Sequence, residues 1–267
     1  KFQEMIAEGT LLVTTSGKAQ GQVNALTVYD FGYFSFGRPA RVTAATRLGE
    51  EGIVDIERRV KLTGSSYDKG VLIISGLLGE RFAQKIPLSL STSICFEQSY
   101  SGVDGDSASA AEFYAVLSSL TGAPIDQGTA VTGSVNQKGE IQAIGGVNEK
   151  IEGFFEICKL QGLTGKQGVV IPSSNVPHLM LKEEVVQAVR KKKFSIYAIK
   201  RIDEGFPILM GMPAGKRGKK GLYPDGTLYT LAEKRLREMA LTLRHFGHDK
   251  GRRKAKRAAK RRANRKR

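Results

Sequence analysis

The 267-residue chain contains no tryptophan, only two cysteines and only three histidines, which narrows its possible chemistry. Cys95 and Cys158 lie far apart in apolar segments without C-x-x-C spacing, which predicts buried, reduced thiols rather than a disulfide. The histidines, at positions 178, 245 and 248, form no H-E-x-x-H motif and no cluster with cysteine. The sequence therefore predicts no metal site.

Long hydrophobic runs and a nucleotide-binding loop are also missing. No stretch approaches the roughly 18 uncharged apolar residues of a membrane-spanning helix, and the first residues lack a signal-peptide pattern. We therefore expect a cytoplasmic protein without a membrane partner. The phosphate-binding motif G-x-x-x-x-G-K-[ST] does not occur, so we expect no ATP site in this chain. Because the sequence begins at Lys1 rather than methionine, we expect it to be a fragment of a longer polypeptide.

Positive charge is concentrated at the C-terminal end. The net charge is +16, yet residues 250–267 hold 12 Lys or Arg and no Asp or Glu, so the remainder is only +4. Alanine is the only apolar residue type in this tail, which predicts disorder because no core can form. Such a tail is suited to contact nucleic-acid phosphates, although a merely solubilising extension is the alternative.

The alternation of short apolar runs and helical patterns predicts an α/β (α+β) fold with mixed sheets and flanking helices. A globular domain is expected over 1–212, a linker and C-terminal helix over 213–249, and a disordered tail over 250–267. Residues 32–39 are expected to form a looser connection. Strands are predicted at 10–15, 22–31, 40–47, 53–60, 88–96, 129–135, 141–144, 169–171 and 194–199. Helices are predicted at 67–84, from 110 onward, and at 147–161, 181–193, 202–212 and 230–246.

The stretch 103–109, Val-Asp-Gly-Asp-Ser-Ala-Ser, leads into a predicted helix and places Ser107 at or just before its N-terminus. Free N–H groups and the helix dipole there favour developing negative charge, as the oxyanion of an acyl-transfer reaction requires. The alternative is local capping. Asp106 and Ser107 are good N-cap residues, and Ser109 with Glu112 fits a capping box.

Lys150 is the candidate partner of this serine. It follows Gly145-Gly146 at the start of a predicted helix whose apolar residues include Ile151 and Phe154. A partly apolar pocket lowers the pKa of a lysine, and the neutral amine can then take a proton from a hydroxyl group. The alternative is an ordinary exposed lysine beside Glu149.

Three linked motifs resemble the proteolytic domain of Lon-type ATP-dependent proteases: Asp-Gly-Asp-Ser-Ala at 104–108, Ala-Val-Thr-Gly-Ser at 130–134 and Gly-Gly-Val-Asn-Glu-Lys at 145–150. The resemblance extends to residues 21–26 and 96–99, covers roughly residues 8 to 210 in order, and is nearest to the B-type, Lon-related bacterial branch. Two positions depart from the pattern, because Asp106 replaces a frequent proline and Ser109 a frequent glycine.

The resemblance implies roles for individual residues. Ser107 would be the nucleophile and Lys150 the general base, while Asp106 and its neighbours would support the oxyanion site. Thr132 would hold the lysine amine, with a β-branched strand residue of purely structural role as the alternative. A carboxylate at position 106 would also raise the lysine pKa and oppose its action as a base.

Phe96 and Glu97 end the strand that leads into the serine turn. In a protease such a strand can pair with a peptide substrate, and an interior strand is the commoner alternative. We treat both residues as substrate-strand candidates.

By the same resemblance we expect a serine endopeptidase that cleaves unfolded or regulatory proteins, assembles as a homo-oligomeric, hexameric ring, and receives ATP coupling only from an ATPase module outside this chain. Two alternatives remain open. One is a catalytically silent, Lon-like scaffold that contacts nucleic acid through its basic tail, as in the RadA group of DNA-repair proteins. The other is a Ser-Lys amidase acting on small molecules.

Overall fold

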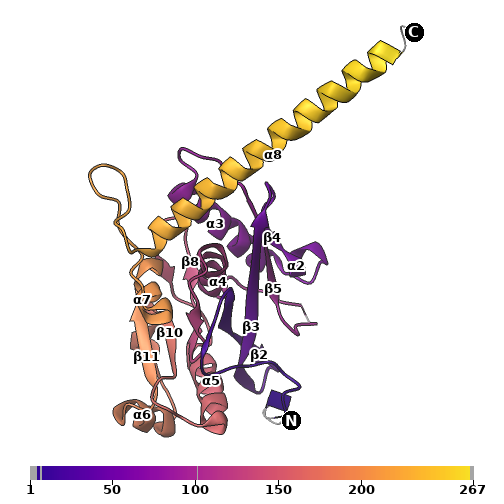
Figure 1. Cartoon of the computed structure of the whole chain (residues 1–267). Coiled ribbons are helices and arrows are strands. Elements are labelled where there is room, and N and C mark those ends of the chain that lie inside the picture. The colour runs from indigo at the N-terminus through magenta and orange to yellow at the C-terminus, as the bar shows by residue number, and fades with distance from the viewer. Residues whose placement is uncertain (1–4, 7, 101, 265–267) are drawn as a thin grey trace.

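A seven-stranded mixed sheet forms the middle layer of the protein in a computed structural model that describes residues 5–6, 8–100 and 102–264. The strand order is β11-β10-β7-β2-β3-β5-β4 (Figure 1). β2 pairs antiparallel with β3, and β3 with β5, while the remaining pairs are parallel. The strands are β2 (Gln22–Asp30), β3 (Ser35–Leu48), β4 (Gly52–Asp55), β5 (Leu90–Phe96), β7 (Thr129–Val131), β10 (Gly168–Pro172) and β11 (Ser195–Ile199).

Two short antiparallel pairs and a set of helices surround this sheet. The pairs join β1 (Lys18–Ala19) to β6 (Ile125–Asp126) and β8 (Ser134–Val135) to β9 (Ile141–Gln142). The α-helices are α2 (Ile56–Arg59), α3 (Ser65–Phe82), α4 (Ser109–Thr121), α5 (Val147–Gln161), α6 (Glu183–Arg190), α7 (Gly205–Met210) and α8 (Leu228–Asn264). Two 3-10 helices, η1 (Ser173–His178) and η2 (Ile202–Glu204), complete the elements. The predicted mixed α/β fold is confirmed.

Side-chain alternation along the central strands builds a separate core on each face of the sheet. Val23 and Ala25 of β2 pack into a cluster with α3, α4, α7 and the start of α8, whereas Leu26 faces a second cluster with α5 and α6. The predicted helix over 147–161 coincides with α5. Both cysteines are free, as predicted, although Cys95 is only half-buried.

Two strand predictions and one prediction of a loose connection are wrong, each for a physical reason. Residues 10–15 form no strand, because side chains rather than a neighbouring strand bind their backbone: Gln98 Oε1 accepts from Leu12 N, and Gln98 Nε2 donates to Thr10 O. The strand predicted at 53–60 ends at Asp55, whose Oδ1 accepts from Arg58 N and caps α2. The expected loose connection at 32–39 is mostly strand, since β3 begins at Ser35 and forms a hairpin with β2.

Helix α8 is longer than the helix predicted at 230–246, and residues 265–267 of the predicted disordered tail lie outside the described residues. The helix begins against the core through Leu228, Tyr229 and Leu236 and continues as one helix to Asn264, projecting from the body (Figure 1). Alanine, lysine and arginine all have high helix propensity, so a segment unable to build a core still forms a helix here. Among the residues that the structure describes, no helix is both long and apolar enough to cross a membrane.

Candidate active site

Ser107 lies in the turn between β5 and α4, and hydrogen bonds from two directions hold that turn. Asp104 Oδ1 accepts from the backbone N–H groups of Gly105 and Tyr67, and Ser107 O accepts from Gly133 N at 2.8 Å. Helix α4 begins two residues later with Ala108 as its N-cap. The serine is thus fixed just before a helix N-terminus, as predicted.

The capping alternative for this turn is wrong. Ala108 provides no side-chain cap, and Ser109 Oγ instead accepts from Val135 N at 3.0 Å, which ties α4 to β8. The side chain of Glu112 is buried in the core rather than turned back to the helix start. Local spacing suggested a capping box, but the contacts of α4 with its neighbours direct both side chains elsewhere.

Lys150 reaches the serine from the first turn of α5. Its Nζ lies 2.8 Å from Ser107 Oγ and 3.3 Å from Thr132 Oγ1, and its side chain is buried. Burial lowers the pKa of Lys150 to about 8, although the charge of Asp106 acts in the opposite direction. The alternative of an ordinary exposed lysine is therefore contradicted.

Thr132 and Asp106 complete the surroundings of this pair. The Thr132 hydroxyl is within hydrogen-bonding distance of both Lys150 Nζ and, at 3.4 Å, the carbonyl oxygen of Ser107. The Asp106 carboxylate accepts from Ser134 Oγ at 2.7 Å. Asp106 thus connects the serine turn to β8, while its charge acts on Lys150 only through space.

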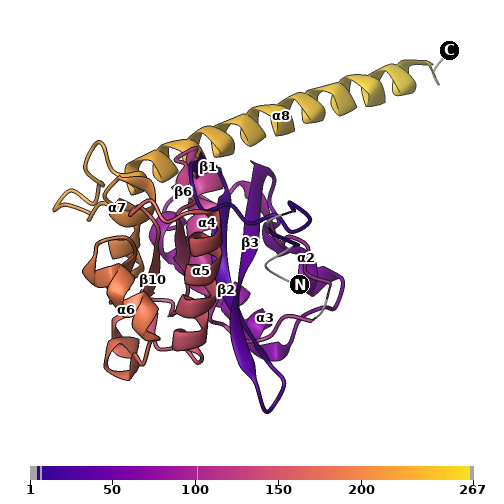
Figure 2. The same cartoon turned by 90° about the horizontal axis from the view of Figure 1, so that it is seen from below.

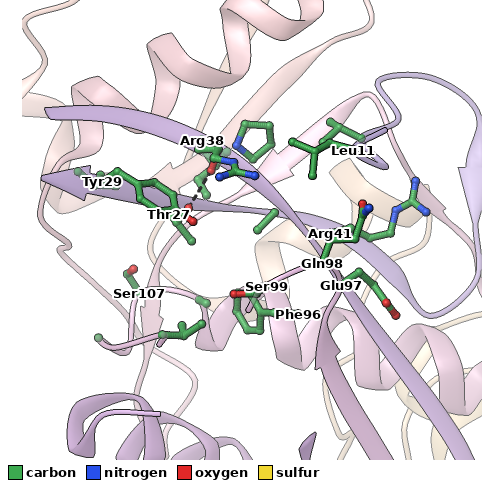
Figure 3. A pocket seen from close by; sticks show the side chains of 18 of the residues that line it. Leu11, Thr27, Tyr29, Arg38, Arg41, Phe96, Glu97, Gln98, Ser99 and Ser107 are labelled. Atoms are coloured by element: carbon green, nitrogen blue, oxygen red, sulfur yellow. Dashed lines mark hydrogen bonds between the residues drawn. The ribbon is translucent and has the colours of Figure 1, made fainter. Parts of the chain in front are cut away.

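A cleft of about 270 Å³ opens beside Ser107. Its walls come from β2, β3, residues 96–99, residues 102–105, Ser107 and Ala108, with residues 11–13 on a further side. Figure 3 shows Ser107 on the same side of the cleft as Thr27 and Tyr29, with Phe96 to Ser99 beyond it. The arrangement leaves the serine hydroxyl open to a molecule in the cleft while its lysine neighbour is buried.

Phe96 and Glu97, the substrate-strand candidates, both lie in the wall of the cleft, and their pairing with a substrate strand stays a prediction. β5 lies between β3 and β4, but β4 pairs only with Ser91–Ile94, and Phe96 N donates to the side chain of Glu57 at 2.9 Å. Glu97 N donates to Arg41 O, and its carboxylate accepts from Thr43 Oγ1 at 2.6 Å. Both residues line the cleft, but their backbone N–H groups already have protein partners.

The strand that does offer an edge at the cleft is β2. In the described part of the chain, β7 pairs with β2 only at Asn24 and Ala25, so the edge of β2 continues past β7 from Leu26 to Asp30. Residues 26–30 all line the cleft. The sequence predicted this strand correctly. Its open edge, however, can be recognised only from the order of the strands, because the edge exists where β2 extends beyond the shorter β7.

A cluster of buried acidic groups lies behind the serine turn. Tyr67 Oη donates to Asp55 Oδ2 at 2.7 Å, and Glu57 accepts from Phe96 N, while Glu112 Oε1 is buried without a hydrogen-bond partner. Burial raises the pKa of Glu112 to about 8. No group of three or more His, Cys, Asp or Glu side chains within the described ranges is arranged to hold a metal ion.

Replacing Glu112 with glutamine should stabilise the fold at alkaline pH. The carboxyl group ionises near pH 4.5 when unfolded but near pH 8 when folded, so the parent protein loses stability as pH rises between these values. The loss is at most about 1.4 kcal/mol per pH unit. We expect Glu112→Gln to show a stability gain in urea unfolding that grows from pH 5.5 to 8.5. The exposed Glu183→Gln is the control, and a gain independent of pH would contradict the assignment.

The sequence model described as "Lon protease (S16) C-terminal proteolytic domain" matches residues 96–211, which include Ser107, Thr132 and Lys150. The chain therefore belongs to the Lon protease family, through its proteolytic domain.

Individual relatives support the same assignment. The chain is 44% identical over 214 residues to a "Putative Lon protease homolog" of Escherichia coli (strain K12), covering 79% of this chain and 36% of the relative. A protein of the same description from Haemophilus influenzae (strain ATCC 51907 / DSM 11121 / KW20 / Rd) is 38% identical over 84% of this chain and 38% of its own length. An "Archaeal Lon protease" of Pyrococcus abyssi (strain GE5 / Orsay) is 33% identical over 63% of this chain and 17% of its own length. The chain thus spans little more than a third of the bacterial relatives it matches.

Proposed function

We propose that this domain is a serine endopeptidase in which Ser107 is the nucleophile and Lys150 the general base. The observation that carries the proposal is the 2.8 Å contact between a buried lysine amine of lowered pKa and a serine hydroxyl that faces a cleft. An amine with a pKa near 8 is neutral in a large fraction of molecules at mildly alkaline pH, and only the neutral form can accept a proton.

In the proposed reaction, Ser107 Oγ attacks the carbonyl carbon of the scissile bond while its proton moves to Lys150 Nζ. The C–N bond then breaks as Lys150 returns that proton to the leaving amine, which leaves an acyl ester on Ser107. Water attacks this ester, Lys150 accepts the water proton, and the proton passes back to Ser107 Oγ as the acid product leaves.

The remaining groups of the site have supporting roles. We assign the oxyanion position to backbone N–H groups around residues 106–107, because the N-terminal end of α4 favours negative charge there. Thr132, within 3.3 Å of Nζ, holds the amine in line with the hydroxyl. Asp106 opposes the lowering of the lysine pKa and thereby sets the pH at which the base becomes active.

We infer that the substrates are polypeptides in extended conformation, since the cleft follows the edge of β2 from Leu26 to Asp30. Regulated degradation of unfolded or regulatory proteins then requires an unfolding activity. This chain has no G-x-x-x-x-G-K-[ST] motif, so we assign ATP coupling to a module outside it, and assembly into a ring to the complete protein.

A peptidyl boronate tests the proposal directly, because boron binds a competent serine nucleophile and needs no ATPase. We expect a single covalent adduct by intact mass, mapped to Ser107 by peptide analysis. The matching peptide amide, which lacks boron, is the control. Absence of an adduct on the folded protein would contradict the proposed chemistry and favour a catalytically silent binding module.

Changing Asp106 to asparagine should shift the pH dependence of hydrolysis to lower pH. Removing this negative charge removes the effect that raises the lysine pKa, so more of the amine is neutral at pH 7. For each protein we compare kcat/KM at pH 7 with its plateau value at high pH. We expect this ratio to be about two- to fivefold higher in the variant than in the parent. The measurement is the full pH profile of peptide hydrolysis.

Ser134→Ala is the matched control for this variant. It removes the hydrogen bond to the Asp106 carboxylate but keeps the charge. A profile that shifts equally in both variants would show that turn geometry, rather than charge, controls the base.

A further inference from the structure

The hairpin between β2 and β3 carries an unusual set of exposed rings. Phe31 is 60% exposed, Tyr33 94% and Phe34 58%. The pairing of Tyr29 with Phe36, and the hydrogen bond from Phe31 N to Phe34 O, place the rings of Tyr29, Phe31, Phe34 and Phe36 on one face of the hairpin. We call these four residues the aromatic face.

The aromatic face is continuous within itself. The ring of Phe36 stacks on Tyr29 at 5.7 Å, on Phe34 at 5.7 Å and on Phe31 at 6.3 Å between centroids. Such stacking fixes the rings before any ligand arrives, so binding to them costs little side-chain entropy. The face is therefore a stacked aromatic surface in which Phe31 and Phe34 are exposed and Tyr29 and Phe36 are half-buried. The Arg38 guanidinium lies 5.3 Å from the centroid of the Tyr29 ring.

The aromatic face is also continuous with the cleft. Tyr29 belongs to both, and Thr27, two residues earlier on the same face of β2, lines the cleft beside Ser107. Figure 3 shows Tyr29 and Thr27 in the cleft on the side of Ser107. A strand rises about 3.3 Å per residue, so a chain extended along β2 from Thr27 reaches the hairpin turn four to six residues away.

We propose that the aromatic face is a remote substrate subsite that binds apolar side chains four to six residues from the cleaved peptide bond. The inference rests on the proposed function, because the cleft beside Ser107 sets the register. Solvent-exposed rings bind apolar and aromatic side chains by burying area and by ring stacking. The domain would thus favour segments with apolar residues at that spacing, as in polypeptides that normally bury them.

The continuity with the cleft favours a substrate chain as the occupant. A second copy of the protein docked on Phe31 and Phe34 would cover the end of the cleft formed by Tyr29 and Asp30. A substrate chain, in contrast, occupies the cleft and the aromatic face together.

The experiment uses two series of 14-residue peptides that share one central sequence, with the cleaved bond mapped by mass spectrometry. One series carries Phe-Leu-Phe at positions four to six from that bond, on either side in turn, and the other carries Ser-Gly-Ser there. The protein variants are the double substitution Phe31→Ser, Phe34→Ser and the control Phe246→Ser. Phe246 is 63% exposed on α8, which lies across the body from the hairpin (Figure 2).

For the parent and for Phe246→Ser, we expect kcat/KM for one apolar peptide to exceed that for its polar partner by about tenfold, mainly through KM. In the hairpin variant this ratio should fall to near one. Anisotropy of the labelled peptides on a Ser107→Ala background should show the same ratio in Kd.

Three results would overturn the inference. The parent could show no preference for the apolar peptide, or the hairpin variant could show the same preference as the parent. In the third, the hairpin variant loses the preference and sedimentation shows that its state of assembly has changed as well. The last result would assign the aromatic face to a second copy of the chain. A boronate adduct on Ser107 together with any of these results would leave the proposed function intact, whereas no adduct in any protein would count against the function itself.

Discussion

Ser107→Ala should abolish peptide hydrolysis and boronate addition together. We expect kcat/KM to fall by at least about 10⁴-fold, because members of a nucleophile–base pair act as a unit and removing either one removes the covalent route. The substitution deletes one oxygen beside Lys150 Nζ and leaves the backbone contact from Gly133 N to the carbonyl of residue 107 in place. The fold should therefore be retained.

The measurement is hydrolysis of an unfolded, labelled protein, with thermal unfolding as the check on folding. Ser174→Ala, at an exposed position of η1, is the matched control and should keep full activity. Residual activity within tenfold of the parent would show that another group supplies the nucleophile.

Lys150→Ala should have an effect of similar size, a loss of about 10³- to 10⁴-fold in kcat/KM. Without the amine, no buried base accepts the Ser107 proton. Lys150→Arg should be equally inactive, because a guanidinium group stays protonated throughout the accessible pH range. A small primary amine added to Lys150→Ala should restore part of the activity by occupying the vacated space.

The pH profile gives a second measure of the same role. Parent kcat/KM should rise with pH and level off above about pH 8, where the Lys150 amine is mostly neutral. Lys159→Ala, on the exposed side of α5, is the control and should leave both the rate and the profile unchanged.

Lys150→Ala is expected to remain folded, and thermal unfolding of the variant checks this. Burial lowers the pKa of Lys150 in the folded state, so the folded protein disfavours the charged amine. The buried amine therefore lowers the free energy of unfolding at every pH below about 10.5. Removing the amine relieves this cost at pH 7, although a small cavity remains. An alanine variant that is stable but inactive would support the base, whereas one that is stable and active would contradict it.

Local sequence alone determined much of the site. The apolar spacing of Ile151 and Phe154 fixed α5, and glycine before that helix gave Lys150 its place in the first turn. The position of Ser107 just before α4 followed in the same way, from the helical apolar spacing of the residues after it. The nearness of Thr132 to the amine was expected only from the resemblance to the Lon family, and the Thr132 hydroxyl lies 3.3 Å from Lys150 Nζ.

The tertiary structure decided what depends on contacts between distant residues. The capping box at Ser109 and Glu112 was locally reasonable, yet β8 binds the serine hydroxyl and the core buries the glutamate. Phe96 ended a correctly predicted strand, but only the order of the strands showed that the edge of β2 lies beside Ser107.

The physical reason is the difference between helices and sheets. A helix closes its hydrogen bonds within four residues, so sequence spacing predicts both its position and its buried face. A strand completes its hydrogen bonds with partners far along the chain, so sequence predicts that it exists but not which edge stays open. The Ser107–Lys150 pair could therefore be read from motifs, whereas the cleft and the aromatic face of the hairpin exist only in the folded protein.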